Sequence, residues 1–295
     1  MPISSKGRVL MGEFELLQTI YDASKNLGCS VTIGPGDDMG EIVLGGKRLL
    51  LAVDQLHVGR HVELDCAPEA IGRKAIARCF SDIAAMCGFP VCSLMTACLP
   101  TPCDDQWATR VFSSAKAHAE QWGGPIIGGD IATSDCEHAM FTVTALATPS
   151  EIGAVKRVGA QLGDLVCVTG ELGNSIEGHH LTFEPRIKLA QTIQHTLGVD
   201  LHSMIDISDG LAQDAGHLAS DGCSIQLDAS SLPLRSGATI EAALGDGEDY
   251  ELLFTCTKQP PIDDVTVIGN VVERGDSKVI DEAGNAINIR GWAHE

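Results

Sequence analysis

Short apolar strands alternate along the chain with segments of helical periodicity, and this alternation constrains the fold more than any other feature. Residues 49–54, LLLAVD, form a continuous apolar run typical of a buried strand. After Pro68, a residue that the first turn of a helix tolerates, apolar residues recur at helical spacing. Those positions are Ile71, Ala75, Cys79 and Ile83. The pattern predicts an α/β (α+β) fold.

The alternation continues through the rest of the chain. A second helix is expected over 104–122. PIIGGD is expected to be a strand that breaks into a turn, and HAMFTVTALA is expected to be a further strand of the same sheet. Beyond a loop-like segment, the expected elements are the strand LVCVTG, a helix over 185–197, a helix opened by DISDG, and strands near 223–228, 249–256 and 264–269. Since 295 residues accommodate two domains of roughly 150 residues, we divide the chain into 1–150 and 151–295.

The charge of the chain excludes several classes of partner. Lys and Arg number 20 and Asp and Glu number 40, so the net charge is −20. Such a surface repels phosphate backbones and anionic lipids, which argues against nucleic acid and membrane partners. The sequence has neither an apolar run of about 18 residues nor an N-terminal signal peptide, so a cytoplasmic location is expected.

The cysteines do not indicate a disulfide framework. There are 11 of them, an odd number, and no C-x-x-C pair occurs among them. A tetrathiolate zinc site is therefore not favoured either. We interpret them as reduced cysteines that act as small hydrophobic residues.

Aspartates gather in glycine-containing turns and next to apolar segments. They are Asp37 and Asp38 in GPGDDMG, Asp54 at the end of LLLAVD, Asp82 in CFSDIAAM, Asp130 in IIGGD, and Asp206 and Asp209 in MIDISDG. A single aspartate in such a turn usually forms an Asx turn or caps a helix. Several of them at the sheet edge, where open α/β folds bind small ligands, indicate a binding site.

Clustered carboxylates raise one another's pKa, and divalent cations relieve that repulsion. Mg²⁺ prefers oxygen ligands and is commonly completed by substrate phosphates, which suits an aspartate-rich site without a histidine cluster. The sequence lacks a G-x-x-x-x-G-K-[ST] loop, a strict G-x-G-x-x-G and the protein-kinase motifs. It therefore predicts a magnesium-assisted phosphate site of another type.

Nine motifs occur in the order expected of the thiamine-monophosphate kinase family, within the aminoimidazole-ribonucleotide-synthetase-like superfamily. They are GPGDDMG, VDQLHVGRHV, FSDIAAMCGFP, IIGGD, KRVGAQLGD, VTGELGNSIEG, EPRIKLA, MIDISDGLAQDAGHL and GEDYELLF. The resemblance implies an N-terminal domain that binds ATP and Mg²⁺, a homodimer whose N-terminal sheets join into a barrel, and a C-terminal α/β domain. It also implies transfer of the γ-phosphate of ATP to thiamine monophosphate, giving thiamine diphosphate and ADP.

The resemblance also implies roles for individual residues. The magnesium ligands would be Asp38, Asp54, Asp82, Asp130, Asp206 and Asp209. Asp130 and Asp209 would be catalytic, and Gly129, Asp130, Arg157 and Ser208 would contact the nucleotide. The thiamine substrate would contact His61, Glu248 and Trp292. From the residues alone, Ser208 can equally cap the following helix, and His61 and Trp292 can be ordinary packing residues.

The chain also departs from the family. Ala52 and Val53 stand where the family usually has hydroxyl residues, Asp246 replaces a glycine in GDGEDYE, and IIGGDIATS lacks the threonine that usually follows the aspartate. These departures permit a second reading, a non-catalytic or re-purposed nucleotide-binding paralogue. Another ATP-dependent enzyme of the superfamily and a metal-dependent phosphohydrolase are further alternatives.

Overall fold

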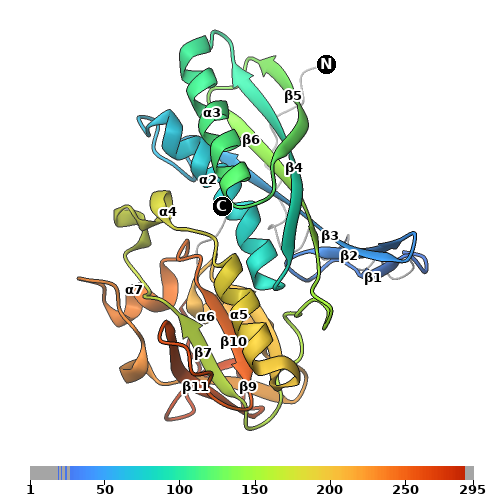
Figure 1. Ribbon diagram of the computed structural model, residues 1–295. Helices are drawn as coiled ribbons and strands as arrows, with labels where there is room; N and C mark the ends of the chain where they lie inside the picture. The colour runs from blue at the N-terminus through green and yellow to red at the C-terminus, as the bar shows by residue number, and fades with distance from the viewer. Residues whose placement is uncertain (1–18, 20, 22–23, 25–26, 290–295) are drawn as a thin grey trace.

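The computed structural model describes residues 19, 21, 24 and 27–289, which form two mixed sheets of six strands each (Figure 1). The first sheet has the strand order β1-β2-β3-β6-β4-β5, in which only β4 and β5 are parallel neighbours. Its strands are β1 (Val31–Ile33), β2 (Gly40–Leu44), β3 (Lys47–His57), β4 (Phe89–Pro100), β5 (Ile126–Ser134) and β6 (Met140–Thr148).

Two helices, α2 (Pro68–Ala85) and α3 (Asp105–Gln121), cover one face of this sheet. Pro68 opens α2 where a helix needs no amide donor, and the side chain of Asp104 caps α3 by accepting a hydrogen bond from the amide of Gln106. The apolar side of α2 packs on the sheet through buried residues such as Cys79 and Ile83.

The other face of the first sheet is open to solvent. Leu51, Val53 and Leu94 lie on it with exposed fractions of 36%, 66% and 44%. The register places Val53 and Leu94 in one row, joined through Thr144 of β6. The face therefore presents an apolar surface that no described residue of the chain covers.

The second sheet has the strand order β12-β9-β11-β7-β10-β8. Its strands are β7 (Leu165–Thr169), β8 (Leu201–Asp206), β9 (Cys223–Leu227), β10 (Leu252–Cys256), β11 (Val265–Glu273) and β12 (Val279–Asp281). The helices of this half are α4 (His179–Thr182), α5 (Ile187–Leu197), α6 (Leu211–Leu218) and α7 (Ile240–Gly245).

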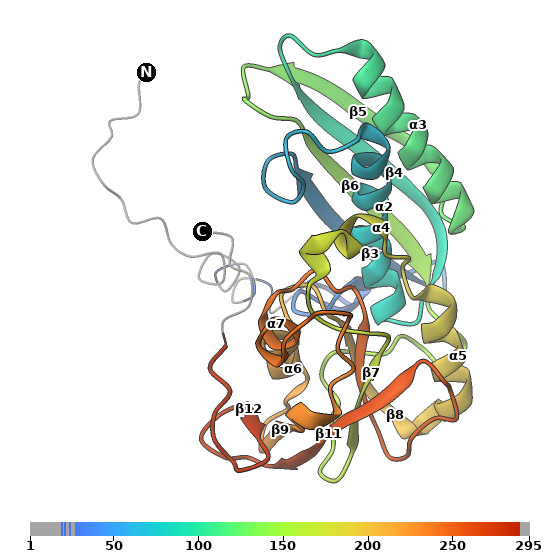
Figure 2. The same cartoon turned by 90° about the vertical axis from the view of Figure 1, so that its left-hand side faces the viewer.

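Helices cover both faces of the second sheet, and α2 joins the two halves. Buried residues of α5 share one apolar core with the first sheet and α2, whereas α6 and α7 pack on the opposite face in a second core. The end of α2 contacts α5 and β8, so it lies between the sheets (Figure 2). This placement brings the end of β8 to the side of α2.

The sequence-based prediction of an α+β fold is confirmed, as are most of the expected helices and strands. Two local expectations were wrong. Residues Ile126–Ser134 form a continuous strand, so Asp130 lies within β5 and not in a turn. Strand β3 continues past Asp54 to His57, so Asp54 lies inside the strand and not at its end. Asp82 lies within α2, as the helical periodicity predicted. The elements that were not predicted are the strands β1, β2, β4, β8 and β12 and the short helices α4 and α7. Among the described residues, no helix is long and apolar enough to cross a membrane.

Helices α2 and α3 approach closely at Gly72. A Cβ atom on Gly72 would lie 2.1 Å from the carbonyl oxygen of Val111 and 2.9 Å from the amide nitrogen of Ala115. We expect Gly72→Ala to reduce the free energy of unfolding by about 1–3 kcal/mol, because the helices must move apart. In α6, a Cβ on Gly216 would meet Val279 at an ordinary 3.7 Å, so Gly216→Ala is the matched control and should stabilise by up to about 1 kcal/mol. Urea denaturation measures both, and an unchanged stability of Gly72→Ala would contradict this packing.

Candidate active site at the junction of the two halves

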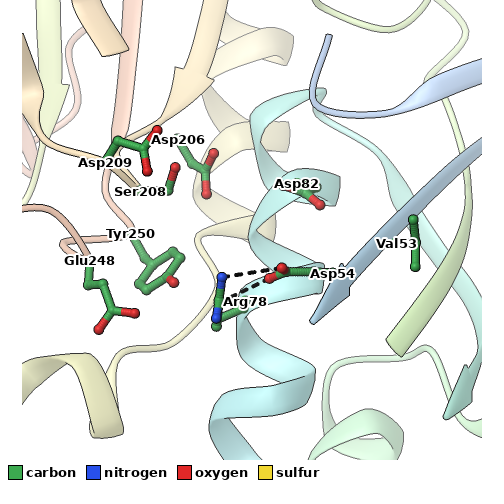
Figure 3. Close-up of a pocket in the computed structure, with 9 residues that line it drawn as sticks. All are labelled: Val53, Asp54, Arg78, Asp82, Asp206, Ser208, Asp209, Glu248 and Tyr250. Atoms are coloured by element: carbon green, nitrogen blue, oxygen red, sulfur yellow. Dashed lines mark hydrogen bonds and ion pairs between the residues drawn. The ribbon is translucent and has the colours of Figure 1, made fainter. Parts of the chain in front are cut away.

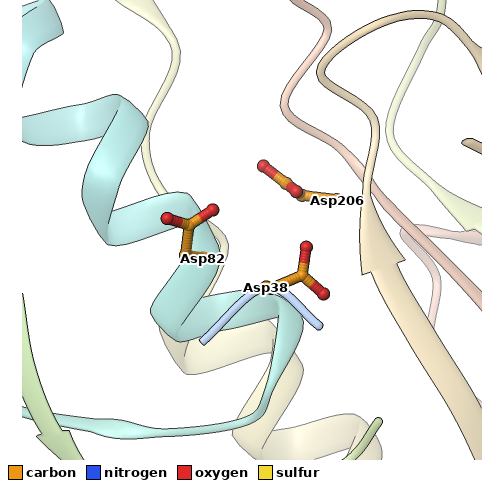
Figure 4. Close-up of side chains that lie close together, drawn as sticks. All are labelled: Asp38, Asp82 and Asp206. Carbon is orange, nitrogen blue, oxygen red and sulfur yellow. The ribbon is translucent and has the colours of Figure 1, made fainter. Parts of the chain in front are cut away.

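Three carboxylates from distant parts of the chain meet at the junction. Asp38 comes from the loop between β1 and β2, Asp82 from α2, and Asp206 from the last position of β8 (Figure 4). Each offers an oxygen atom, and these atoms lie within 4.8 Å of one another. The cluster brings together three of the six aspartates predicted to bind magnesium.

The cluster is buried and short of positive charge. Burial, followed by the charge of neighbouring aspartates, raises the pKa of Asp82 and of Asp206 above the usual range. Arg157 donates a hydrogen bond of 2.6 Å from Nη2 to Oδ1 of Asp38, and Ser81 donates one of 2.5 Å from Oγ to Oδ2 of Asp206. Oδ2 of Asp38 is buried and has no hydrogen-bond partner. An all-carboxylate cluster with an unpaired oxygen suits a hard divalent cation such as Mg²⁺.

Asp37 fixes the loop that carries Asp38. Its Oδ1 accepts hydrogen bonds from the backbone amides of Asp38 and Arg157, both at 3.1 Å. The loop after β1 and the segment that carries Arg157 are therefore tied together at the cluster. Asp37 thus fixes the backbone of the site next to Asp38, which is the predicted metal ligand.

The carboxylate cluster borders a cavity of about 210 Å³ (Figure 3). Its lining comes from β3, α2, the end of β8 with the loop that follows, and the segment before β10. The lining residues are Val53, Asp54, Arg78, Asp82, Asp206, Ser208, Asp209, Glu248 and Tyr250. Of the predicted site residues, this cavity therefore collects Asp54, Asp82, Asp206, Ser208, Asp209 and Glu248.

Asp214 shapes the loop on which Ser208 and Asp209 lie. Its Oδ2 accepts hydrogen bonds from the backbone amides of Ser208, Asp209 and Gly210, at 3.0–3.1 Å. Gly210 is the residue that precedes α6, and no side chain caps this helix, so Ser208 does not have the capping role that the sequence left open. Asp214 was not predicted as a site residue; its signal in the sequence is an acidic residue in the first turn of the helix that follows DISDG.

A buried lysine holds Glu248, one of the residues that line the cavity. Lys74 of α2 is 0% exposed, and its Nζ donates to the carbonyl oxygen of His61, to Nδ1 of His180 and to Oε2 of Glu248, at 2.6, 2.7 and 2.6 Å. Burial lowers the pKa of Lys74 to about 8, although the ion pair with Glu248 acts in the opposite direction. For Glu248, burial alone would raise the pKa, but the contact with His180 and the ion pair with Lys74 lower it to about 2. Glu248 is therefore ionised at neutral pH.

Two residues of the GEDYE motif have left-handed backbone conformations. Glu248 has φ 54° and Tyr250 has φ 50°, values that side-chain-bearing residues adopt at a cost. The ring of Tyr250 stacks on that of Phe183 with centroids 4.1 Å apart. The stacking on Phe183 and the ion pair with Lys74 thus hold a strained segment in place. Figure 3 shows Glu248 and Tyr250 of this segment at the cavity.

Asp54 contacts a cation rather than the carboxylate cluster. Nη2 of Arg78 donates to Oδ1 of Asp54 at 3.2 Å, and Nε of Arg78 lies 3.0 Å from Oδ2. Asp209 accepts a hydrogen bond of 2.9 Å from Nε2 of Gln213. Both aspartates line the cavity, but neither belongs to the group that lies within 4.8 Å.

Gly129 and Asp130 lie apart from this cavity. Across the sheet, Asp130 of β5 lies in one row with Thr96 of β4, Thr142 of β6 and Gln55 of β3. The neighbouring row joins Gly129 of β5 to Asp54 of β3 by way of Met95 and Val143. Because successive strand residues point to opposite faces, the side chains of Asp130 and Asp54 lie on opposite faces of the sheet. Their strands, β5 and β3, are three strand spacings apart, which is roughly 14 Å. The role of Asp130 as a ligand stays a prediction. His61 does not line the cavity, but its backbone carbonyl accepts a hydrogen bond from Lys74, the partner of Glu248. Trp292 lies outside the described residues.

Comparisons with known proteins identify the class and then the family. A family model described as "AIR synthase related protein, N-terminal domain" matches residues 36–171, so this part of the chain has the fold of an AIR-synthase-related N-terminal domain. Thiamine-monophosphate kinase of Aquifex aeolicus is 33% identical over 96% of this chain and 98% of that protein, and that of Rhodopirellula baltica is 35% identical over 76% of each. The chain belongs to the thiamine-monophosphate kinase family, as its motifs predicted.

A solved structure supports the same assignment. AaThiL complexed with AMPPCP and TMP matches with a TM-score of 0.85 and 32% identity, over 99% of this chain and 100% of that chain. The hydrogenase maturation protein HypE, 17% identical with a TM-score of 0.69, shares the fold. The two-sheet architecture therefore also occurs in more distant proteins.

The low pKa of Glu248 gives a testable pH dependence. Its folded-state pKa of about 2 lies below the ordinary value of 4.5, so its contribution to stability is complete above about pH 4.5 and is lost as the pH falls toward 2. We expect Glu248→Gln to lower the free energy of unfolding by about 3 kcal/mol at pH 7, and this difference from the wild type to shrink below pH 4.5. Denaturant titrations at pH 7, 4 and 3 measure it. A constant difference over that range would show that the carboxylate does not stabilise the fold through its charge.

Proposed function

We propose that the protein transfers the γ-phosphate of ATP to the phosphate of thiamine monophosphate, producing thiamine diphosphate and ADP. The observation that carries this proposal is the buried cluster of Asp38, Asp82 and Asp206 at the edge of a polar cavity. Membership of the thiamine-monophosphate kinase family supplies the substrates, and a solved relative binds AMPPCP and TMP.

Asp38, Asp82 and Asp206 would hold Mg²⁺, and Asp54 and Asp209 line the cavity that this cluster borders. When bound, Mg²⁺ would neutralise the negative charge of the transferred phosphoryl group. Arg157 lies against Asp38, where its guanidinium can also bind nucleotide phosphates. The backbone turn around Ser208, fixed by Asp214, would orient the hydroxyl group toward the same phosphates.

The acceptor determines which other groups the reaction needs. A phosphate monoester is already anionic at neutral pH, so it can attack in line without a strong general base. In agreement, no histidine is among the described residues that line the cavity. Positioning and charge neutralisation would supply most of the rate.

The substrate side would be formed by Glu248 and Tyr250. Glu248 is ionised and buried against Lys74, and a carboxylate there can accept a hydrogen bond from the substrate or balance the cationic thiazolium ring. His61 would contribute through the same network. Lys74 acts on Glu248 and is a positioning residue in this scheme.

A homodimer would explain the open face of the first sheet. Leu51, Val53 and Leu94 form an exposed apolar face, and Asp130 points from that same face at the edge strand β5. A second copy of the chain packed on this face would cover the apolar residues and close the two sheets into a barrel. It would also bring Asp130 of one copy toward the site of the other, which the position of Asp130 within one chain does not allow.

The direct test is incubation with ATP, Mg²⁺ and thiamine monophosphate, followed by chromatographic detection of thiamine diphosphate. We expect the product with the wild type and a loss of at least about 100-fold in kcat with Asp206→Asn and Asp209→Asn, because the site loses charge that positions the metal. Asp221→Asn, in an exposed turn, is the control that should retain activity. Nucleotide binding without product would favour the paralogue, and phosphate release without an acceptor would favour a phosphohydrolase.

Mixing two inactive variants tests whether Asp130 acts across the dimer. Asp130→Asn and Asp206→Asn should each be inactive, but heterodimers would hold one site with both aspartates. Co-refolding in equal amounts should restore about a quarter of the wild-type activity, since half of the dimers are mixed and each has one complete site. Co-refolding each variant with itself is the control. No recovery in the verified heterodimer would place Asp130 in its own subunit's site or outside the chemistry.

A further inference from the structure

Arg78 is a cation that lines the cavity, and none of the roles proposed above involves it. It lies on α2, one turn before Asp82, and its side chain is 12% exposed. Nη1 donates to the carbonyl oxygen of Gln55 at 3.0 Å and Nη2 to Oδ1 of Asp54 at 3.2 Å. Nε lies 3.0 Å from Oδ2 of Asp54, but not in hydrogen-bonding geometry, so this buried donor has no hydrogen-bond partner. The guanidinium is held in place with part of its donor capacity unused.

The two other cations near the cavity, Lys74 and Arg157, contact other acceptors. The ammonium group of Lys74 has three acceptors at 2.6–2.7 Å and no exposed surface, which uses all three of its donors. Arg157 donates to Asp38 at the metal cluster. Among the described residues that line the cavity, Arg78 alone is positively charged.

Arg78 is placed to bind a phosphate that lies between the Asp54 side and the Glu248 side of the cavity. Its guanidinium lies between Asp54 on one side and Glu248 and Tyr250 on the other (Figure 3). Asp82 and Asp206, of the carboxylate cluster, line the same cavity. A guanidinium binds a carboxylate and a phosphate with the same fork of donors, so a phosphate can replace Asp54 as its partner.

We propose that Arg78 binds the phosphate group of the acceptor substrate, and that Asp54 holds the guanidinium ready in its absence. This inference rests on the proposed function, because the acceptor is taken to be a phosphate monoester. When a phosphate takes the guanidinium, Asp54 is released and can face the carboxylate cluster. Arg78 would then contribute to binding the acceptor and to the charge balance of the transferred group, besides being the counter-ion of Asp54.

Calorimetric titration in Mg²⁺-containing buffer separates phosphate binding from a purely structural role. Three ligands are compared: thiamine monophosphate, thiamine and inorganic phosphate. For Arg78→Gln we expect the affinity for thiamine monophosphate and for inorganic phosphate to fall about 10- to 100-fold, because charge-assisted hydrogen bonds to the phosphate are lost. The affinity for thiamine, which has no phosphate, should stay within about twofold of the wild type. Arg78→Lys keeps the charge but not the fork, so its loss should be intermediate.

Arg73→Gln is the matched control, since it removes a guanidinium from the same helix. The Arg73 guanidinium donates to the carbonyl oxygens of Leu181 and Thr182 and does not line the cavity. Arg73→Gln should leave all three affinities unchanged, and circular dichroism confirms that each variant is folded. Equal binding of thiamine monophosphate and inorganic phosphate by the wild type and Arg78→Gln would overturn the inference, and so would equal losses for thiamine and its monophosphate. If the wild type binds inorganic phosphate through Arg78 but not thiamine monophosphate, Arg78 is a phosphate-binding residue and the proposed function fails.

Discussion

The repulsion among the carboxylates of Asp38, Asp82 and Asp206 is the constraint on which the rest of the structure depends. These side chains come from a loop, a helix and a strand end, and their oxygens lie within 4.8 Å of one another. Burial and mutual repulsion raise the pKa of Asp82 and Asp206, so the cluster is costly without a cation. The placement of α2 between the two sheets serves to bring these segments together.

The surrounding ion pairs distribute the remaining charge. Arg157 contacts Asp38, Arg78 contacts Asp54, and Lys74 contacts Glu248, so each side of the cavity has one buried or partly buried cation. The two arginines sit against carboxylates that a metal and phosphates would engage, whereas Lys74 holds a carboxylate in place. In the proposed function, these ion pairs would divide the cavity into a metal side, a phosphate side and a substrate side. This division also reconciles a chain of net charge −20 with polyanionic substrates.

The sequence predicted much of the fold and part of the site. Apolar periodicity located α2, and a continuous apolar run located β3. The motifs placed Asp38, Asp82 and Asp206 in one family-specific set, which the structure brings together. Local patterns could not show that IIGGD continues as a strand, because glycines next to an aspartate also favour a turn. Lys74 and Arg78 were missed because their partners Glu248 and Asp54 are distant in the sequence, and helical periodicity alone predicts that a lysine lies at the surface.

Magnesium binding tests the central claim most directly. Isothermal titration of the nucleotide-free protein with Mg²⁺ should show a saturable site that Asp82→Asn weakens by at least about tenfold, because one of the three carboxylates loses its charge. Asp221→Asn, which lies in an exposed turn, should bind like the wild type. If Asp82→Asn bound Mg²⁺ as tightly as the wild type, the three-carboxylate cluster would not be the metal site, and this account of the protein would be contradicted.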